Sequence, residues 1–159
     1  MEIDLSVLEE VGSVEKVDSE IGFKDLSFRN REIKIPELLL LKLDIYKTDD
    51  SFVFSGNLKG KLVLECSRCL KPFPYSFDIE INKEIEEKDI EDLKHFDLNQ
   101  MLNEDIFMTV PIKPLCSEDC EGICPECGQN LNEEECGCET ESIDPRLAKL
   151  NDFYNDDNE

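Results

Sequence analysis

The sequence predicts an α+β protein: an antiparallel β-meander with one helix and a zinc-knuckle appendage near the C-terminal end. Three observations predict this fold: segments in which apolar and polar residues alternate, one capped helical pattern, and six cysteines within residues 116–138. A chain of 159 residues suits one domain, or one domain with a small addition. We therefore expect a β-rich core domain over residues 1–115 and a cysteine-rich zinc segment over residues 116–159.

Three strands are expected in the meander. Residues 33–46 place leucine and isoleucine at alternate positions, and the sequence TDD at 48–50 supplies a turn. Residues 52–66 carry their apolar side chains mainly at even positions, whereas residues 73–81 carry them at odd positions. Each of these segments therefore has one buried face, and the turn between the last two forms the tip of a long hairpin.

Two glycines, Gly56 and Gly60, lie inside the second expected strand. A straight strand of that length would outgrow a small domain, so we expect the glycines to mark bulges or bends. Such bending leaves open whether the meander is barrel-like or an open sheet.

The segments after the meander have different patterns. Residues 84–92 indicate an exposed acidic connector, and Asp97 is a suitable N-cap for a helix over residues 97–109, before Pro111. A last short helix is expected to begin at Asp144, with Pro145 in its first turn.

Eight cysteines form four close pairs, and this spacing is typical of metal knuckles. A C-x-x-C turn lets two thiolates converge on one ion, and Zn²⁺ accepts four such ligands at about 2.3 Å. In the sequence CPECGQNL, Pro125 stiffens the turn and Gly128 can adopt the positive φ that a knuckle needs. Two structural zinc sites are therefore predicted. Their ligands are Cys66, Cys69, Cys116, Cys120, Cys124, Cys127, Cys136 and Cys138.

Loop closure favours pairs that are near in sequence, so the last four cysteines should form one local site. By elimination, Cys66, Cys69, Cys116 and Cys120 should form the other, across a long gap. Thiol redox chemistry is the main alternative for these cysteines. It is disfavoured because the first C-x-x-C lies between two strands rather than at the start of a helix, where a thiol pKa would be lowered.

Charge and hydropathy exclude several classes of function. Lys and Arg number 17 against 39 Asp and Glu, a formal net charge of −22 that repels nucleic acid and attracts basic surfaces. No segment has the roughly 20 apolar residues of a membrane span, and the N-terminus does not resemble a secretory signal. We therefore expect a cytoplasmic location, where thiols stay reduced and disulfides are rare.

Catalytic motifs are absent from the sequence. His95 is the single histidine and lies in an acidic segment, so it is expected to be a surface side chain. An all-cysteine zinc site also leaves no coordination position at which water could be activated. We therefore expect no enzymatic activity and no small-molecule substrate.

Four ordered motifs carry a family resemblance: ECSRCLKPF, EDIFMTVPIKPLC, CEGICPECGQNLN followed by C-x-C, and DPRLAKL. Together they resemble the YceD family of large ribosomal RNA subunit accumulation proteins. The resemblance implies a non-enzymatic role in 23S rRNA accumulation and in large ribosomal subunit biogenesis.

Two kinds of partner are compatible with such a role. The net charge favours a basic ribosomal or assembly protein, captured by acidic residues such as Glu84, Glu86, Glu87 and Glu91. Direct contact with rRNA is the alternative, through a basic cluster near the hairpin tip that contains Lys59, Lys61, Arg68 and Lys71. A zinc- or redox-responsive regulatory protein is a third hypothesis.

Overall fold

The structure is a computed structural model, and it describes residues 1–28 and 31–138. These residues divide into two compact units. The larger contains residues 1–66 and 71–116, and the smaller contains residues 67–70 and 117–138. The short helix predicted to begin at Asp144 lies outside the described residues.

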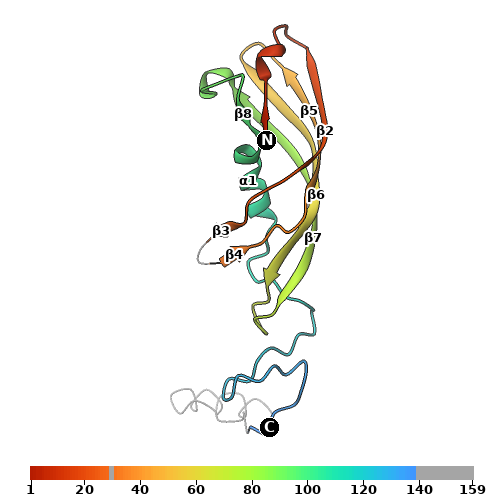
Figure 1. Ribbon diagram of the computed structural model, residues 1–159, viewed down its shortest axis with the longest axis vertical. Coiled ribbons are helices and arrows are strands. Elements are labelled where there is room, and N and C mark those ends of the chain that lie inside the picture. The colour runs from red at the N-terminus through yellow and green to blue at the C-terminus, as the bar shows by residue number, and fades with distance from the viewer. Residues whose placement is uncertain (29–30, 139–159) are drawn as a thin grey trace, which may run out of the picture. The chain divides into compact units, whose positions relative to one another are not determined.

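The larger unit is built on a four-stranded antiparallel sheet with the strand order β2-β5-β6-β7 (Figure 1). Its strands are β2 (Val14–Ile21), β5 (Leu39–Lys47), β6 (Ser51–Glu65) and β7 (Pro72–Glu86). Strands β5, β6 and β7 follow one another as hairpins, which confirms the predicted meander. The barrel-like alternative is wrong, because β2 and β7 are the two edges of this sheet and do not pair with each other.

Shorter elements complete the larger unit. Strand β1 (Glu2–Ile3) pairs with β8 (Phe96–Asp97), and β3 (Leu26–Phe28) pairs with β4 (Arg31–Ile33). Two 3-10 turns, η1 (Leu5–Val7) and η2 (Glu87–Asp89), and one helix, α1 (Leu98–Thr109), are also present. No described helix has the length and hydropathy needed to cross a membrane.

Two sequence-based boundaries are wrong. The strand predicted over residues 33–46 is divided, because β4 ends at Ile33 and β5 begins at Leu39. Pro36 lies in the gap, and a proline has no N–H to donate to a neighbouring strand. The connector predicted over residues 84–92 is strand at its start, since Glu84 and Glu86 pair with β6.

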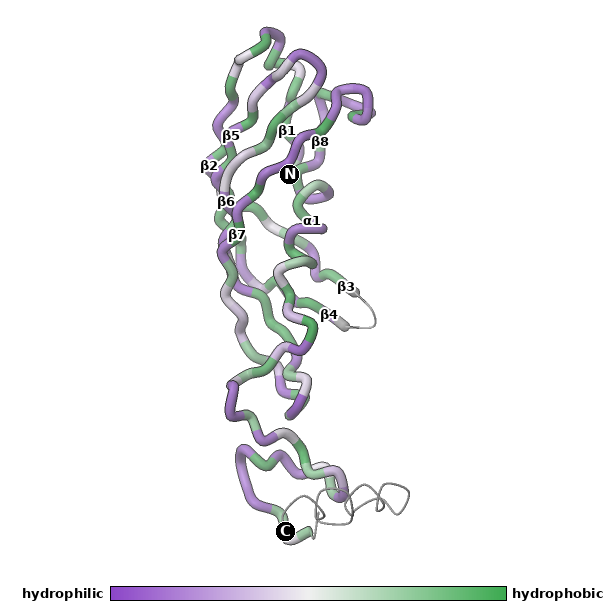
Figure 2. Tube along the Cα trace, turned by 180° about the vertical axis from the view of Figure 1, so that it is seen from behind, coloured by the Kyte–Doolittle hydropathy of each residue, from purple (hydrophilic) through white to green (hydrophobic). Residues whose placement is uncertain are grey.

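The core lies on one face of the sheet, where α1 and the β1–β8 pair also lie (Figure 1). Hydrophobic and hydrophilic residues alternate along the strands, as Figure 2 shows. The hydrophobic side chains of β5 and β6 therefore lie on the face that the core covers, and most of them are buried. Phe54 of β6 stacks on Phe96 of β8, with 5.4 Å between ring centroids. The predicted helix is confirmed, because the Asp97 carboxylate caps it by accepting from the Asn99 amide at 3.0 Å.

Gly56 and Gly60 allow close packing rather than a bulge. The residue-by-residue pairing of β6 with β7 continues through both positions, so the predicted bulges are absent there. A Cβ added at Gly56 would lie 2.0 Å from the Lys42 carbonyl oxygen, and one at Gly60 would lie 2.2 Å from Leu39 Cδ2. Both glycines are therefore needed because β5 and its side chains approach β6 so closely.

Replacing Gly56 with alanine should destabilise the larger unit by about 3 kcal/mol, near the upper end of the usual cost of overpacking. The Cβ would meet a backbone oxygen that cannot move without breaking the β5–β6 pairing. Urea unfolding of Gly56→Ala and of the control Gly22→Ala would measure this cost. At Gly22 the nearest atom is Cδ2 of the exposed Leu38, at 3.3 Å, so the control should stay near wild type. Equal midpoints for the two variants would contradict the packing argument.

Candidate metal centres

The eight cysteines form two groups of four. In each group all four sulfur atoms lie within 4.8 Å of one another. A tetrahedral Zn²⁺ with Zn–S bonds of about 2.3 Å would hold its sulfurs about 3.8 Å apart, so each group could hold one metal ion. The tip group is Cys66, Cys69, Cys116 and Cys120, and the loop group is Cys124, Cys127, Cys136 and Cys138. These are the two sets that the spacing of the pairs predicts.

The C-x-x-C turns of the two groups share one backbone geometry. The Cys66 amide donates to the Lys71 carbonyl at 2.9 Å, and the Cys124 amide donates to the Gln129 carbonyl at 2.8 Å. In both turns the residue after the second cysteine has a positive φ. This residue is Gly128 in the loop group (φ 75°), as predicted, and Leu70 in the tip group (φ 60°). A leucine in this conformation costs about 1–2 kcal/mol, so its surroundings must impose the turn.

The thiols of the loop group influence one another's ionisation. The pKa of Cys124 is lowered to about 7, chiefly because the amides of Cys127 and Glu126 donate hydrogen bonds to its sulfur. The pKa of Cys138 is raised to about 12, with the neighbouring thiol of Cys127 as the largest cause. Four neighbouring thiolates repel one another, so without a cation the four thiols would not all be ionised. A bound cation would offset this repulsion between thiolates. The donor set thus fits a divalent metal.

Four thiolates would fill a tetrahedral coordination sphere and leave no position for a substrate or an activated water. The chemistry that such sites can supply is crosslinking of the chain. Three cysteines of the tip group are buried, whereas Cys116 is exposed. In the loop group Cys124 is buried and Cys127 is exposed.

Basic residues predicted to contact rRNA make contacts within the chain, among them Lys59 and Arg68. Lys59 forms an ion pair with Asp78 at 2.7 Å across the β6–β7 hairpin. Arg68 donates through Nη1 to the carbonyls of Glu118 at 3.1 Å and Cys120 at 2.8 Å. Lys61 and Lys71 are exposed. The sequence did not predict the contact of Arg68, because it joins residues about fifty positions apart.

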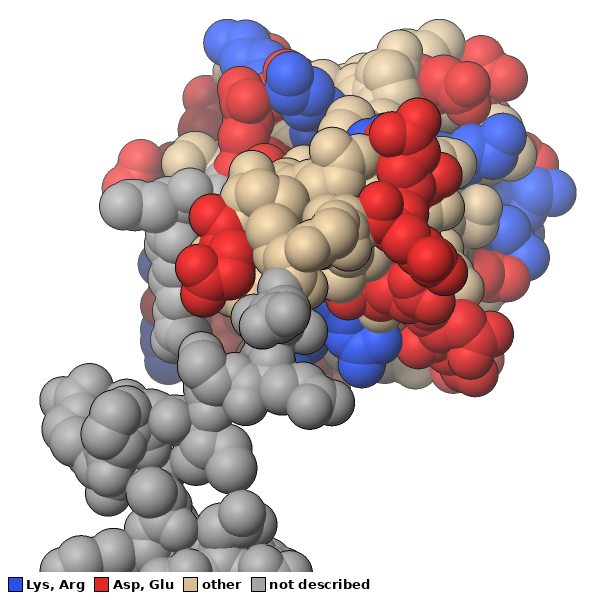
Figure 3. Space-filling view, turned by 90° about the horizontal axis from the view of Figure 1, so that it is seen from below, with Lys and Arg blue, Asp and Glu red and all other residues tan. Residues whose placement is uncertain are grey.

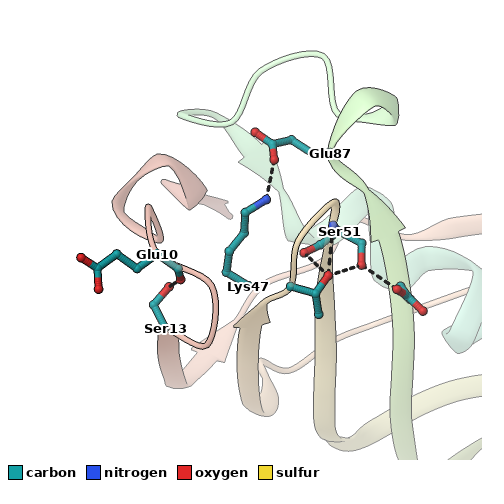
Figure 4. Close-up of polar contacts among 7 residues, drawn as sticks. Glu10, Ser13, Lys47, Ser51 and Glu87 are labelled. Carbon is teal, nitrogen blue, oxygen red and sulfur yellow. Dashed lines mark hydrogen bonds and ion pairs between the residues drawn. The ribbon is translucent and has the colours of Figure 1, made fainter.

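The acidic residues predicted to capture a partner also differ in their surroundings. Figure 4 shows Lys47 reaching Glu87 beside Ser51, and the Lys47 side chain is 8% exposed. Glu84 accepts from Ser51 Oγ at 2.6 Å, and Glu86 forms an ion pair with Lys88. Glu87 and Glu86 are therefore occupied by lysines of the same chain.

A groove of about 850 Å³ lies in the larger unit. We call its exposed lining residues the rim and its less exposed apolar lining residues the floor, and most of the rim residues are carboxylates. Four apolar residues that are half-buried or buried also line the groove: Ile85 of β7, Ile90 directly after η2, Phe96 of β8 and Met101 of α1. Lys83 also lines it, but its ammonium contacts Asp105 at 2.9 Å and the Met101 carbonyl at 2.8 Å. The exposed acidic residues of the groove are Glu84, Asp89, Glu91, Asp92, Asp97 and Glu104. Two of the predicted residues, Glu84 and Glu91, belong to this set.

His95 is exposed, as predicted, and lines the same groove. Its Nδ1 lies 2.9 Å from Asp92 Oδ2, and this contact raises the pKa of His95 and lowers the pKa of Asp92. Protonation of His95 as the pH falls would therefore remove one unit of negative charge from the groove.

The fold and the cysteine groups define an acidic α+β protein with two candidate four-cysteine metal sites. The family model described as "Large ribosomal RNA subunit accumulation protein YceD" matches residues 54–154, a range that includes all eight cysteines. The chain belongs to the YceD family.

Relatives in two bacterial groups are similar to the chain. "Uncharacterized protein Rv2926c" of Mycobacterium tuberculosis (strain ATCC 25618 / H37Rv) is 33% identical over 127 residues, which cover 71% of this chain and 60% of that protein. "Uncharacterized protein YlbN" of Bacillus subtilis (strain 168) is 27% identical over 158 residues, which cover 89% of each chain. The chain thus spans about three fifths of the length of the mycobacterial relative. No solved structure matches it.

Metal-replete protein should carry two metal ions per chain, because each group offers four sulfurs at coordination spacing. Native mass spectrometry should detect both ions, and a chelator should remove them with loss of structure around the cysteines. Cys127→Ser should retain one ion. Full stability with no bound metal would contradict a structural role for the two groups.

Proposed function

We propose that this protein is a non-enzymatic factor that supports 23S rRNA accumulation and large ribosomal subunit biogenesis by binding a basic ribosomal or assembly protein. The family description supports the connection with large-subunit rRNA. We further propose that both cysteine groups hold structural Zn²⁺, the ion that four thiolates in a closed tetrahedral site favour, and that the protein acts in the cytoplasm.

Net charge supports a basic partner. Eight zinc-bound thiolates and two Zn²⁺ ions change the formal charge by −8 + 4 = −4, from −22 to about −26. Such a field repels the phosphate backbone of RNA and accelerates encounter with a basic protein. Figure 3 gives an end-on view in which acidic side chains occupy most of the charged surface, with smaller groups of Lys and Arg.

The groove is the observation that carries the proposal. It is lined both by the exposed carboxylates of the rim and by the less exposed apolar side chains of the floor, among them Ile85, Phe96 and Met101. A segment that carries Lys or Arg beside apolar residues would complement both features, because its cations would meet the rim while its apolar side chains would cover the floor. A nucleic acid strand offers anionic phosphates and would be repelled by the same rim.

Direct rRNA contact is the weaker alternative, because Lys59 and Arg68 already have partners within the chain. A redox-responsive regulator is a further alternative. It would release metal after mild oxidation, and zinc content after peroxide treatment would reveal that behaviour.

Removing half of the rim's exposed carboxylates should impair function without unfolding the protein. In a strain that lacks the gene, we expect less 23S rRNA and a lower ratio of large to small subunits, and the wild-type chain should restore both. The triple variant Asp89→Asn, Glu91→Gln, Glu104→Gln should fail to restore them, because the groove loses three of its exposed carboxylates. Sucrose-gradient profiles and 23S rRNA quantification would measure the outcome.

A matched control removes the same charge outside the groove: Glu20→Gln, Glu37→Gln, Glu65→Gln. It should behave as wild type, and both triple variants should keep two zinc ions. Binding of purified basic large-subunit proteins should weaken in the groove variant and decline with added salt, since the Debye length is about 8 Å at physiological ionic strength. Tight 23S rRNA binding at physiological salt, lost on substitution of Lys61 and Lys71, would instead establish direct contact.

A further inference from the structure

A short segment, residues 120–124, carries one cysteine of each group. Cys120 belongs to the tip group and Cys124 to the loop group. On one side, the Cys120 carbonyl accepts from Arg68 Nη1 at 2.8 Å. On the other side, Ile123 forms a β-bridge with Asn130, and the Leu131 amide donates to the Gly122 carbonyl at 2.9 Å. The segment is therefore held between the hairpin tip and the loop that joins Cys127 to Cys136.

Gly122 makes this close packing possible. Its φ is +86°, and a Cβ at this position would lie 3.2 Å from the Arg68 carbonyl oxygen. The segment has little room to shift against the hairpin tip, so a displacement on the loop side would be transmitted to Cys120.

Asn132 extends from that loop to a ligand of the other group. Its Oδ1 accepts from the Glu121 amide at 2.9 Å, which fixes the orientation of the side-chain amide. Its Nδ2 therefore faces the tip group and donates to Cys120 Sγ at 3.5 Å. Nδ2 also contacts Asn130 Oδ1 at 2.7 Å and the Gly122 carbonyl at 3.5 Å. Residues that donate to a metal ligand orient it and tune its donor strength.

We propose that Asn132 is a positioning residue that couples the two metal sites: ordering of the loop by metal in the loop group brings an N–H donor to Cys120 in the tip group. Metal in one group then raises the affinity of the other, and the effect is reciprocal because it is a coupling free energy between sites. This inference concerns metal loading and does not depend on the proposed role in ribosome biogenesis.

The first experiment uses the full chain loaded with ¹¹³Cd²⁺, whose NMR frequency responds to hydrogen bonds at the coordinating sulfurs. Correlation with cysteine β-protons assigns one resonance to each group. Asn132→Ala should shift the resonance of the tip group more than that of the loop group. Asn132→Asp retains the acceptor for the Glu121 amide but loses the donor to Cys120, so it should shift the same resonance. The control Gln129→Ala keeps the backbone carbonyl that binds the Cys124 amide and should leave the tip-group resonance unchanged.

The second experiment measures zinc affinity of the tip group by chelator competition. Asn132→Ala and Asn132→Asp should each weaken it about 10-fold or more, the usual effect of losing such a contact. Cys127→Ser, which disables the loop group, should also weaken it, and by a smaller factor when Asn132 is already alanine. Two results would overturn the proposal: an Asn132→Asp variant with wild-type resonances and affinity, or a Cys127→Ser effect of equal size in both backgrounds.

Discussion

The unbroken pairing of β6 with β7 is the constraint on which both candidate sites depend. Every residue from Ser51 to Glu65 has a fixed partner between Glu86 and Pro72. Because side chains alternate along a strand, a slip of one residue would turn the buried face of β6 toward solvent. The same register fixes where the hairpin ends. At one end it delivers Cys66 and Cys69 to the tip group, and at the other it places Glu84 and Ile85 in the groove.

Burial explains which elements the sequence could predict. Strands β5 to β7 and helix α1 have a buried face with a regular period, so alternation and capping were sufficient to find them. Strand β2 was missed because it is an edge strand with one fully buried residue, Ile21, and β1 and β8 contain two residues each. The cysteine sets followed from loop closure. Leu70 and Asn132 had no local signal, because a leucine does not favour positive φ and the contact of Asn132 depends on the folded loop.

Total charge alone did not locate a binding surface. Many carboxylates of the larger unit face lysines across the sheet, as in the Lys16–Asp44, Lys42–Asp18 and Lys59–Asp78 pairs, and these pairs neutralise one another. Such exposed pairs add little stability, but each cancels one negative charge on the outer face of the sheet. Excess negative charge remains where acids have no lysine partner nearby. The groove holds such acids: Lys83, which lines it, is engaged by Asp105, and the N-terminal ammonium of Met1 contacts the groove carboxylate Asp97 at 3.4 Å.

The candidate metal sites and the groove differ in charge and in apolar surface. A zinc ion with four thiolates carries a formal charge of about −2, so neither cysteine group would attract a phosphate backbone. Their capacity is to crosslink segments that have few buried apolar side chains of their own: in the described part of the smaller unit the buried residues are chiefly cysteines. On the proposed function, recognition of a partner would require a surface with apolar area as well as charge. The groove combines the two, and its floor and rim both arise from the end of β7, from η2, and from the first turns of α1 with the segment before it. A partner that binds there would be selected by sign of charge at long range and by apolar complementarity at contact.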